Sequence, residues 1–356
     1  MHPDKLLSQT IQFLRFPLMV AVVVIHTHIA DIAIGGEQLT YASQYPFFDV
    51  LYHLLSGMLT KVAVPLFFFI SGYLFFYQCT FSWQVYLRKL KSRVKTLLIP
   101  YIFWNAALCA MVLVAQLLFP SFLSGKNTLV LDYGVSEWVD VVFANVPMNP
   151  FWFIRDLIIM VVASPLIYAM LKYTRWVPLV LLGILAGLGV NLHTTAMGIE
   201  SLFYFMWGAY FSINKVNVAQ YCLNKRYVFL ALYALLLVVD LYCWVNQPAY
   251  LLYAHKTSLI VGVLAFMAWA ARGVATQKLK VNNTLTDAAF FLFCLHNPLT
   301  VFLSKLWVTF LAPMSDVKMI VGYLLIPLVV TIFLVCLYLL LRRYMPRFTA
   351  VITGGR

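Results

Sequence analysis

Residues 11–30 read IQFLRFPLMVAVVVIHTHIA, a stretch that is long and apolar enough to cross a bilayer as a helix. Arg15 and His26 lie inside it, although an ionisable residue deep in a membrane helix costs about 2.5–3.5 kcal/mol on insertion scales. Eleven helical steps of about 100° place both side chains on one face, about 16 Å apart along the axis. The segment therefore predicts a membrane helix that presents two polar groups at two depths of one stripe.

The composition extends this prediction from one helix to the whole chain. Of the 356 residues, 63% are hydrophobic and 10% are charged, an apolar share well above that of soluble domains. We predict an all-α integral membrane protein, a single transmembrane domain over residues 1–356. Its ten expected spans are residues 11–30, 54–77, 97–119, 151–171, 176–192, 199–213, 228–246, 255–271, 287–311 and 318–341.

The net charge is +13, and the basic residues are distributed as the expected membrane topology requires rather than as on a nucleic-acid-binding surface. With the N-terminus inside, 19 of the 25 Lys and Arg residues fall at cytoplasmic ends or loops. The other six are Lys61, Lys126, Arg155, Lys256, Lys305 and Lys318. This bias predicts that both termini are cytoplasmic and that the chain lies in a cell membrane, the inner or plasma membrane, in contact with its lipids and without a nucleic-acid partner.

Patterns for several other classes of site are absent from the sequence. His26 and His28 are two residues apart, on different sides of a helix, and there is no HExxH or CxxC pattern, so we expect no metal. There is also no Walker loop, no GxGxxG after a strand and no GxSxG elbow. These absences disfavour ATP-driven, dinucleotide-dependent and soluble-hydrolase functions.

Two further groups of polar residues are candidates for chemistry. The inner loop contains WQVYLRKLKSRVK, residues 83–95, whose cations would face lipid headgroups or a phosphate-bearing ligand. Within the spans, six polar residues could converge in the outer half: Arg155, Asp156, Glu200, Asp240, His296 and Asn297. Arg155 and Asp156 could equally form a structural ion pair, and Glu200 and Asp240 could be solvated helix ends.

Five ordered motifs resemble the membrane acyltransferase-3 family over nearly the whole chain. They are Arg15 with His26, VPLFFFISGYLFF (64–76), RVKTLLIPYIFWN (93–105), FWFIRDL (151–157) and FFLFCLHNPL (290–299). One departure concerns the inner loop. Family members often carry a second arginine three residues after the first, whereas this chain has Thr96 there and Lys95 before it. Lysine supplies charge but not arginine's bidentate fork.

The resemblance implies transfer of an acyl group from acetyl-CoA or another acyl-CoA to an extracytoplasmic carbohydrate or lipid-linked acceptor. Arg15 and the cluster Arg88, Lys89, Lys91, Arg93 and Lys95 would hold the phosphates of coenzyme A. His26 would accept the acceptor's proton or become transiently acylated, because imidazole exchanges a proton near neutral pH.

The remaining candidates have auxiliary roles in this scheme. Asp156, Asp240 or Glu200 would orient the histidine or the sugar, and Arg155 would stabilise oxyanion charge. The acceptor would be bound by Glu200, Asp240, His296 and Asn297. Ser71 and Gly72 would either make room for the pantetheine arm or allow close helix packing. Two alternatives remain open: a transporter of polysaccharide or a small anionic metabolite, and a sensory module.

Overall fold

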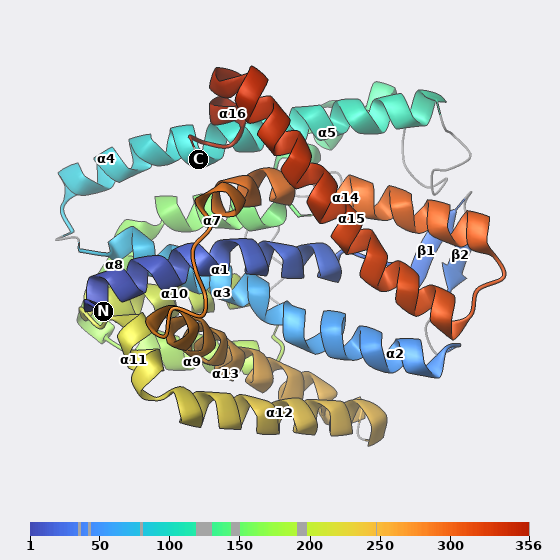
Figure 1. The fold of residues 1–356 in the computed structure, drawn as a ribbon. Coiled ribbons are helices and arrows are strands. Elements are labelled where there is room, and N and C mark those ends of the chain that lie inside the picture. The colour runs from blue at the N-terminus through green and yellow to red at the C-terminus, as the bar shows by residue number, and fades with distance from the viewer. Residues whose placement is uncertain are drawn as a thin grey trace. The chain divides into compact units, whose positions relative to one another are not determined.

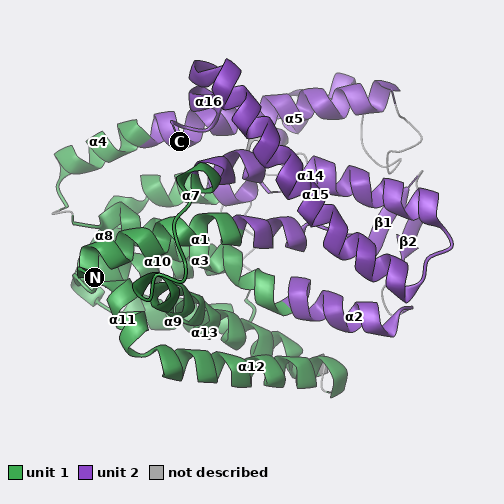
Figure 2. Ribbon diagram, in the orientation of Figure 1, with its two compact units in different colours: residues 1–18, 58–92, 156–286 green, residues 19–57, 93–155, 287–356 purple. Residues whose placement is uncertain are grey.

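The computed structural model describes residues 1–34, 37–41, 44–78, 81–118, 130–143, 150–190, 198–246 and 248–355. The chain divides into two compact units that are interleaved in sequence (Figure 2). Unit 1 comprises residues 1–18, 58–92 and 156–286, and unit 2 comprises residues 19–57, 93–155 and 287–356. The first boundary falls inside helix α1 (Pro3–Ile25), so this one helix carries Arg15 in unit 1 and leads to His26 in unit 2.

Unit 1 is built from helices (Figure 1). After the first part of α1 they are η2 (Thr60–Val62), α3 (Ala63–Phe76), α4 (Trp83–Arg93), most of α7 (Trp152–Val162), α8 (Ser164–Thr174), α9 (Val177–Gly187), α10 (Ile199–Ile213), α11 (Val218–Asn224), α12 (Arg226–Asn246) and α13 (Pro248–Ala275).

The tightest packing in unit 1 joins α3 to α10 through two glycines. A Cβ atom on Gly72 of α3 would collide with the backbone carbonyl of Phe205, and one on Gly208 of α10 would collide with the carbonyl of Phe69. Small residues that let two backbones approach are typical of helix contacts in membranes. The glycines therefore explain why these two helices can lie against each other along their length.

Unit 2 combines helices with one small β-hairpin. After the end of α1 its elements are β1 (Asp31–Ile34), β2 (Glu37–Thr40), α2 (Pro46–Tyr52), η1 (His53–Leu59), η3 (Val94–Leu98), α5 (Ile99–Leu118), η5 (Val130–Asp132), α6 (Val135–Phe143), α14 (Asn283–Leu311), α15 (Asp316–Tyr344) and α16 (Pro346–Ile352). The strands are antiparallel, with Asp31 opposite Thr40 and Ile34 opposite Glu37. An all-helical prediction has no place for this hairpin, which lies in the segment between two spans.

Seven described helices are long and apolar enough to cross a membrane. They cover residues 3–25, 46–76, 83–118, 226–246, 249–275, 283–311 and 316–344. The predicted fourth span is a pair of helices, α7 and α8, bent by 63° at a short break. The predicted fifth and sixth windows contain shorter helices, α9 with 11 residues and α10 with 15. The sequence windows thus all contain helices, although three of them are not single long spans.

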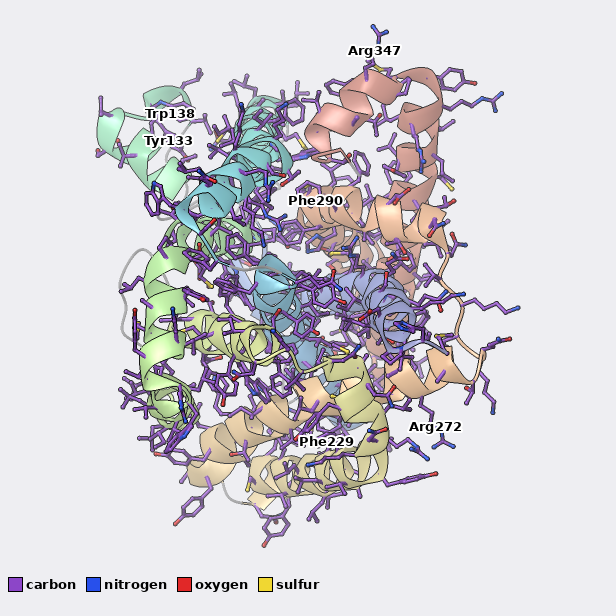
Figure 3. All side chains as sticks on the ribbon, turned by 90° about the vertical axis from the view of Figure 1, so that its left-hand side faces the viewer. Tyr133, Trp138, Phe229, Arg272, Phe290 and Arg347 are labelled. Atoms are coloured by element: carbon purple, nitrogen blue, oxygen red, sulfur yellow. The ribbon has the colours of Figure 1, made fainter. Side chains whose placement is uncertain are left out.

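Basic residues at predicted cytoplasmic positions project from the ends of helices. Arg272, in the last turn of α13 in unit 1, extends away from the ribbon, and so does Arg347 on α16 in unit 2 (Figure 3). Both are exposed.

Candidate functional site

His26 stands at the end of α1, where the helix gives way to the segment leading to β1. Its backbone N–H still donates to the carbonyl of Val22 at 3.1 Å, so the helical repeat reaches it. Thr27 closes the helix, because its Oγ1 donates to the carbonyl of Val23 at 3.0 Å. The His26 side chain is half-buried. Arg15 and His26 are therefore carried by one continuous helical segment.

His296 faces His26 from α14 within unit 2. The two imidazole ring centroids are 5.0 Å apart and the ring planes are inclined by 60°. His28, which is exposed, also lies near His26, at 5.8 Å between ring centroids. Because His26 and His296 are 270 residues apart in the chain, only the packing of α14 against the end of α1 could reveal this pair.

The two ring nitrogens of His296 have different surroundings. Nδ1 lies 2.8 Å from the carbonyl oxygen of Phe293 and 3.2 Å from that of Leu292. Carbonyl oxygens only accept, so Nδ1 carries a hydrogen and Nε2 holds the lone pair of the neutral ring. His296 is fully buried, and its Nε2 has no hydrogen-bond partner among the described residues. A buried acceptor without a partner is costly, which makes Nε2 a place where a ligand hydrogen-bond donor would be stabilised.

An aromatic cluster packs beside this pair. The ring of Phe293 lies 5.7 Å from that of Phe151, 5.9 Å from that of Phe153 and 6.1 Å from that of His296. Residues from the FWFIRDL motif and the FFLFCLHNPL motif thus meet in unit 2. The contact between these two motifs brings Arg155, two residues after Phe153, into the same unit as the histidine pair.

Arg155 and Asp156 sit at the division between the two units. Arg155 is the fourth residue of α7, and its N–H donates to the carbonyl of Phe151 at 3.1 Å. Asp156 follows it and is buried, with 1% of its surface exposed, but it belongs to unit 1. Adjacent helical residues point about 100° apart, so the two side chains leave α7 in different directions.

Asn297 follows His296 on α14 and is a second polar residue at this position of the helix. It is buried, and its carbonyl accepts a hydrogen bond from Thr300 Oγ1 at 2.9 Å. Pro298, which follows it inside α14, has no N–H to donate to the carbonyl four residues earlier. The polar residues His296 and Asn297 therefore lie where the helix backbone is itself irregular in its hydrogen bonding.

The predicted donor-binding cations are divided between helices and units. Arg15 is half-buried in α1, and Lys89 donates from α4 to the carbonyl of Phe75, with its Nζ 5.0 Å from the centre of the Phe75 ring. Arg88 and Lys91 are exposed on α4 in unit 1, whereas Arg93 and Lys95 belong to unit 2. The basic loop is therefore largely a helix, and Lys89 fastens that helix to the end of α3.

Ser71 and Gly72 lie on α3, in unit 1. The space beside Gly72 is occupied by the backbone of Phe205 on α10, and the same contact continues at Gly208. Close helix packing thus explains the glycine of this motif without a ligand.

Glu200 and Asp240 each make a polar contact with α13 in unit 1. Asp240 of α12 is completely buried, and its Oδ2 lies 3.0 Å from His255 Nδ1 and accepts from Ser258 Oγ at 3.2 Å, both on α13. Glu200 of α10 forms an ion pair with Lys256 of α13. The burial of Asp240 does not fit a solvated helix end. Acceptor binding by Glu200 and Asp240 stays a prediction.

The three-residue spacing of His255 and Ser258 is the only sequence signal for their contact with Asp240. Residues three apart on a helix share a face, so one acidic residue on a neighbouring helix can meet both. The sequence does not show which helix supplies it, because that depends on how α12 packs against α13. Removing one partner from such a buried polar cluster leaves an uncompensated group in a low-dielectric interior.

Among the residues with described positions, no group of three or more His, Cys, Asp or Glu side chains could hold a metal ion. The histidine pair itself offers one half-buried imidazole, His26, and one fully buried imidazole, His296, whose Nε2 is an acceptor nitrogen.

Comparisons with known proteins agree with the motifs that meet around this pair. An acyltransferase-domain family model, acyltransferase family 3, matches residues 9–343. The succinoglycan biosynthesis protein ExoH of Rhizobium meliloti (strain 1021) is 26% identical over 360 aligned residues, which cover 99% of this chain and 94% of that protein. No solved structure matches the chain significantly. The chain is a multi-pass membrane acyltransferase and belongs to the acyltransferase-3 family.

Proposed function

We propose that the protein transfers an acyl group from a cytoplasmic acyl-CoA, with acetyl-CoA the first donor to test, to a hydroxyl of an extracytoplasmic glycan or lipid-linked sugar. The observation that carries this proposal is the pairing of His26 with His296 at 5.0 Å between ring centroids, with Nε2 of His296 buried and unpartnered among the described residues. The name of the similar succinoglycan biosynthesis protein supports a polysaccharide as the acceptor class.

The chemical step assigns different roles to the two rings. His26 accepts the proton of the acceptor hydroxyl as its oxygen attacks the thioester carbonyl carbon, a C–O bond forms, and the C–S bond breaks. The proton that His26 gained then passes to the leaving thiolate of coenzyme A, so His26 returns to its neutral form and the protons balance. His296 Nε2 accepts a hydrogen bond from a second acceptor hydroxyl, and Asn297 beside it adds amide donors and acceptors. Transient acylation of His26 is the alternative route to the same product.

The donor side of the proposal rests on cations. Arg15 and the basic residues Arg88, Lys89, Lys91, Arg93 and Lys95 would bind the phosphates of coenzyme A, with arginine the better planar partner. Arg155 would stabilise the oxyanion, and Asp156 would orient a catalytic group. We also propose ten spans with both termini cytoplasmic in a cell membrane, with the bent α7–α8 pair, α9 and α10 supplying three of them.

The test uses proteoliposomes that contain the purified protein, labelled acetyl-CoA on the cytoplasmic face and the cell's surface glycans or lipid-linked sugars on the other. Wild-type protein should produce acylated acceptor, detected by mass spectrometry. His26→Ala should lower the rate at least 10²-fold, because a positioned general base contributes about 10²–10⁴-fold. His2→Ala is the control, since His2 is an exposed histidine that precedes the same helix, and it should retain the rate.

Two outcomes contradict the proposal. Wild-type product levels from His26→Ala would refute the base assignment. Movement of the acceptor across the vesicle membrane without any acylation would instead identify a transporter, because a carrier also needs ionisable residues inside its spans.

A further inference from the structure

A chain of three hydrogen-bonding groups ends on the carbonyl that lies two residues before His26. Ser56 Oγ donates to the carbonyl oxygen of Val24 at 3.1 Å. The same Ser56 Oγ lies 2.6 Å from Tyr323 Oη. All three residues belong to unit 2, as do His26 and His296.

The direction of this chain follows from donor counting. A serine hydroxyl has one hydrogen, and a carbonyl only accepts, so the Ser56 hydrogen is directed to Val24. Tyr323 must therefore donate its own hydrogen to Ser56 Oγ. The order is Tyr323 hydroxyl to Ser56 hydroxyl to Val24 carbonyl, and hydrogen bonds in such a chain polarise and strengthen one another.

The Val24 carbonyl is one of the last carbonyls of α1, which have no intrahelical partner when a helix ends. It accepts from the N–H of Thr27 at 3.1 Å as well as from Ser56. The last turn of α1 is thus held from outside by a side chain of η1. Because His26 follows within that turn, the position of its ring depends on how this turn is held.

Tyr323, the first donor of this hydrogen-bond chain, is held in place by packing. Tyr323 of α15 is completely buried, and its ring packs 5.3 Å from that of Tyr52 and 6.0 Å from that of Phe48, measured between centroids. Phe48 is itself tied to α15, because its N–H donates to Asp316 Oδ1 at 3.0 Å. The tyrosine hydroxyl therefore comes from a side chain with little freedom to move.

Gly322, the residue before Tyr323, lets α15 approach the segment that follows His26. A Cβ atom on Gly322 would lie 2.8 Å from Ile29 Cδ1 and 2.5 Å from Trp307 Nε1, so only glycine fits without a shift. Trp307 of α14, the helix that carries His296, donates to the carbonyl of Lys318 at 3.0 Å. One short stretch of α15 thus contacts both the segment after His26 and the helix of His296.

We infer that Tyr323 and Ser56 are positioning residues of the acyltransferase centre, which hold the end of α1 so that His26 faces His296. Ser56 is presented by η1, a π-helix, and such irregular turns are frequent at functional sites. The inference rests on the proposed role of His26 as the base. It does not place either hydroxyl in contact with the substrate.

The kinetic test compares Ser56→Ala, Tyr323→Phe and the double variant in the proteoliposome assay. We expect kcat to fall about tenfold in Ser56→Ala and about fivefold in Tyr323→Phe, with the KM for acyl-CoA unchanged, since small misplacements of a catalytic group cost up to about 10²-fold. The double variant should be no slower than Ser56→Ala, because groups that act through one chain are not additive. Ser304→Ala is the matched control, a serine of unit 2 that is equally buried but has no hydroxyl partner among the described residues, and it should retain full kcat.

A second measurement does not depend on activity. Hydrogen exchange of the amides at residues 24–29 should accelerate in Ser56→Ala and Tyr323→Phe but not in Ser304→Ala, while the melting temperature of each variant reports whether it is folded. Unchanged kcat and exchange in a folded Ser56→Ala would overturn the inference, and so would independent, multiplying losses in the double variant. Absence of acyl transfer by the wild-type protein would instead count against the proposed function, and the exchange data would still decide whether the end of α1 is held in this way.

Discussion

His26 and His296 show how much a single side chain's role depends on its neighbours. Spacing from Arg15 singles out His26, whereas nothing in the local sequence around His296 indicates that its Nδ1 is bonded to backbone carbonyls and its Nε2 is left facing the interior. His255 is a second example, because it is bonded to the buried Asp240, a partner that its local sequence does not identify.

Arg15 provides a prediction at the residue scale. Replacement by alanine should raise the KM for acyl-CoA about tenfold with a smaller change in kcat, because a charge-assisted contact to phosphate contributes about 1.5–3 kcal/mol. Arg15→Lys is the matched variant, which keeps the charge without the bidentate fork and should fall between alanine and wild type. Steady-state kinetics with varied acyl-CoA measure both constants. Donor saturation identical to wild type in Arg15→Ala would exclude a phosphate contact.

The helices themselves were predictable to the extent that their cause is local. The window 199–213 coincides with α10, and the window 228–246 lies within α12, because an unbroken run of apolar residues needs no partner to form a helix in lipid. The window 151–171 differs, since it is divided by the bend between α7 and α8. The sequence did not predict the hairpin of β1 and β2, because each strand has only four residues and its alternation of apolar and polar residues is weak.

Gly208 provides a prediction at the scale of packed elements. Gly208→Ala should lower the stability of the protein in detergent by about 1–3 kcal/mol, because its new Cβ would meet the backbone of Phe69, which cannot rotate away as a side chain could. Gly187→Ala on α9 is the control, since no heavy atom lies within 4 Å of the added Cβ. Denaturation monitored by tryptophan fluorescence compares them. Equal stability of the two variants would show that α3 and α10 are less closely packed than described.

The whole molecule raises the question of topology, which the proposed reaction requires because donor and acceptor lie on opposite sides of the membrane. In a variant without native cysteines, Ser136→Cys on α6 should react with an impermeant maleimide in intact spheroplasts, and Lys278→Cys, in a predicted inner loop, should react only after lysis. Both positions are exposed, so access decides the result. The reverse pattern would invert the proposed orientation, and labelling of neither or both would refute the placement of at least one loop.

By itself the sequence determined the class of this protein, its membrane helices and the family motifs, because hydropathy and motif spacing are sums over neighbouring residues. It also singled out Arg15 and His26, since a helix relates residues eleven apart by simple geometry. Only the tertiary structure decided that His296 meets His26, that Asp240 meets His255, and that Tyr323 reaches the end of α1 through Ser56. Those contacts join different helices, and the way one apolar helix surface packs against another is set by the shapes of all the side chains between them, which no local pattern records.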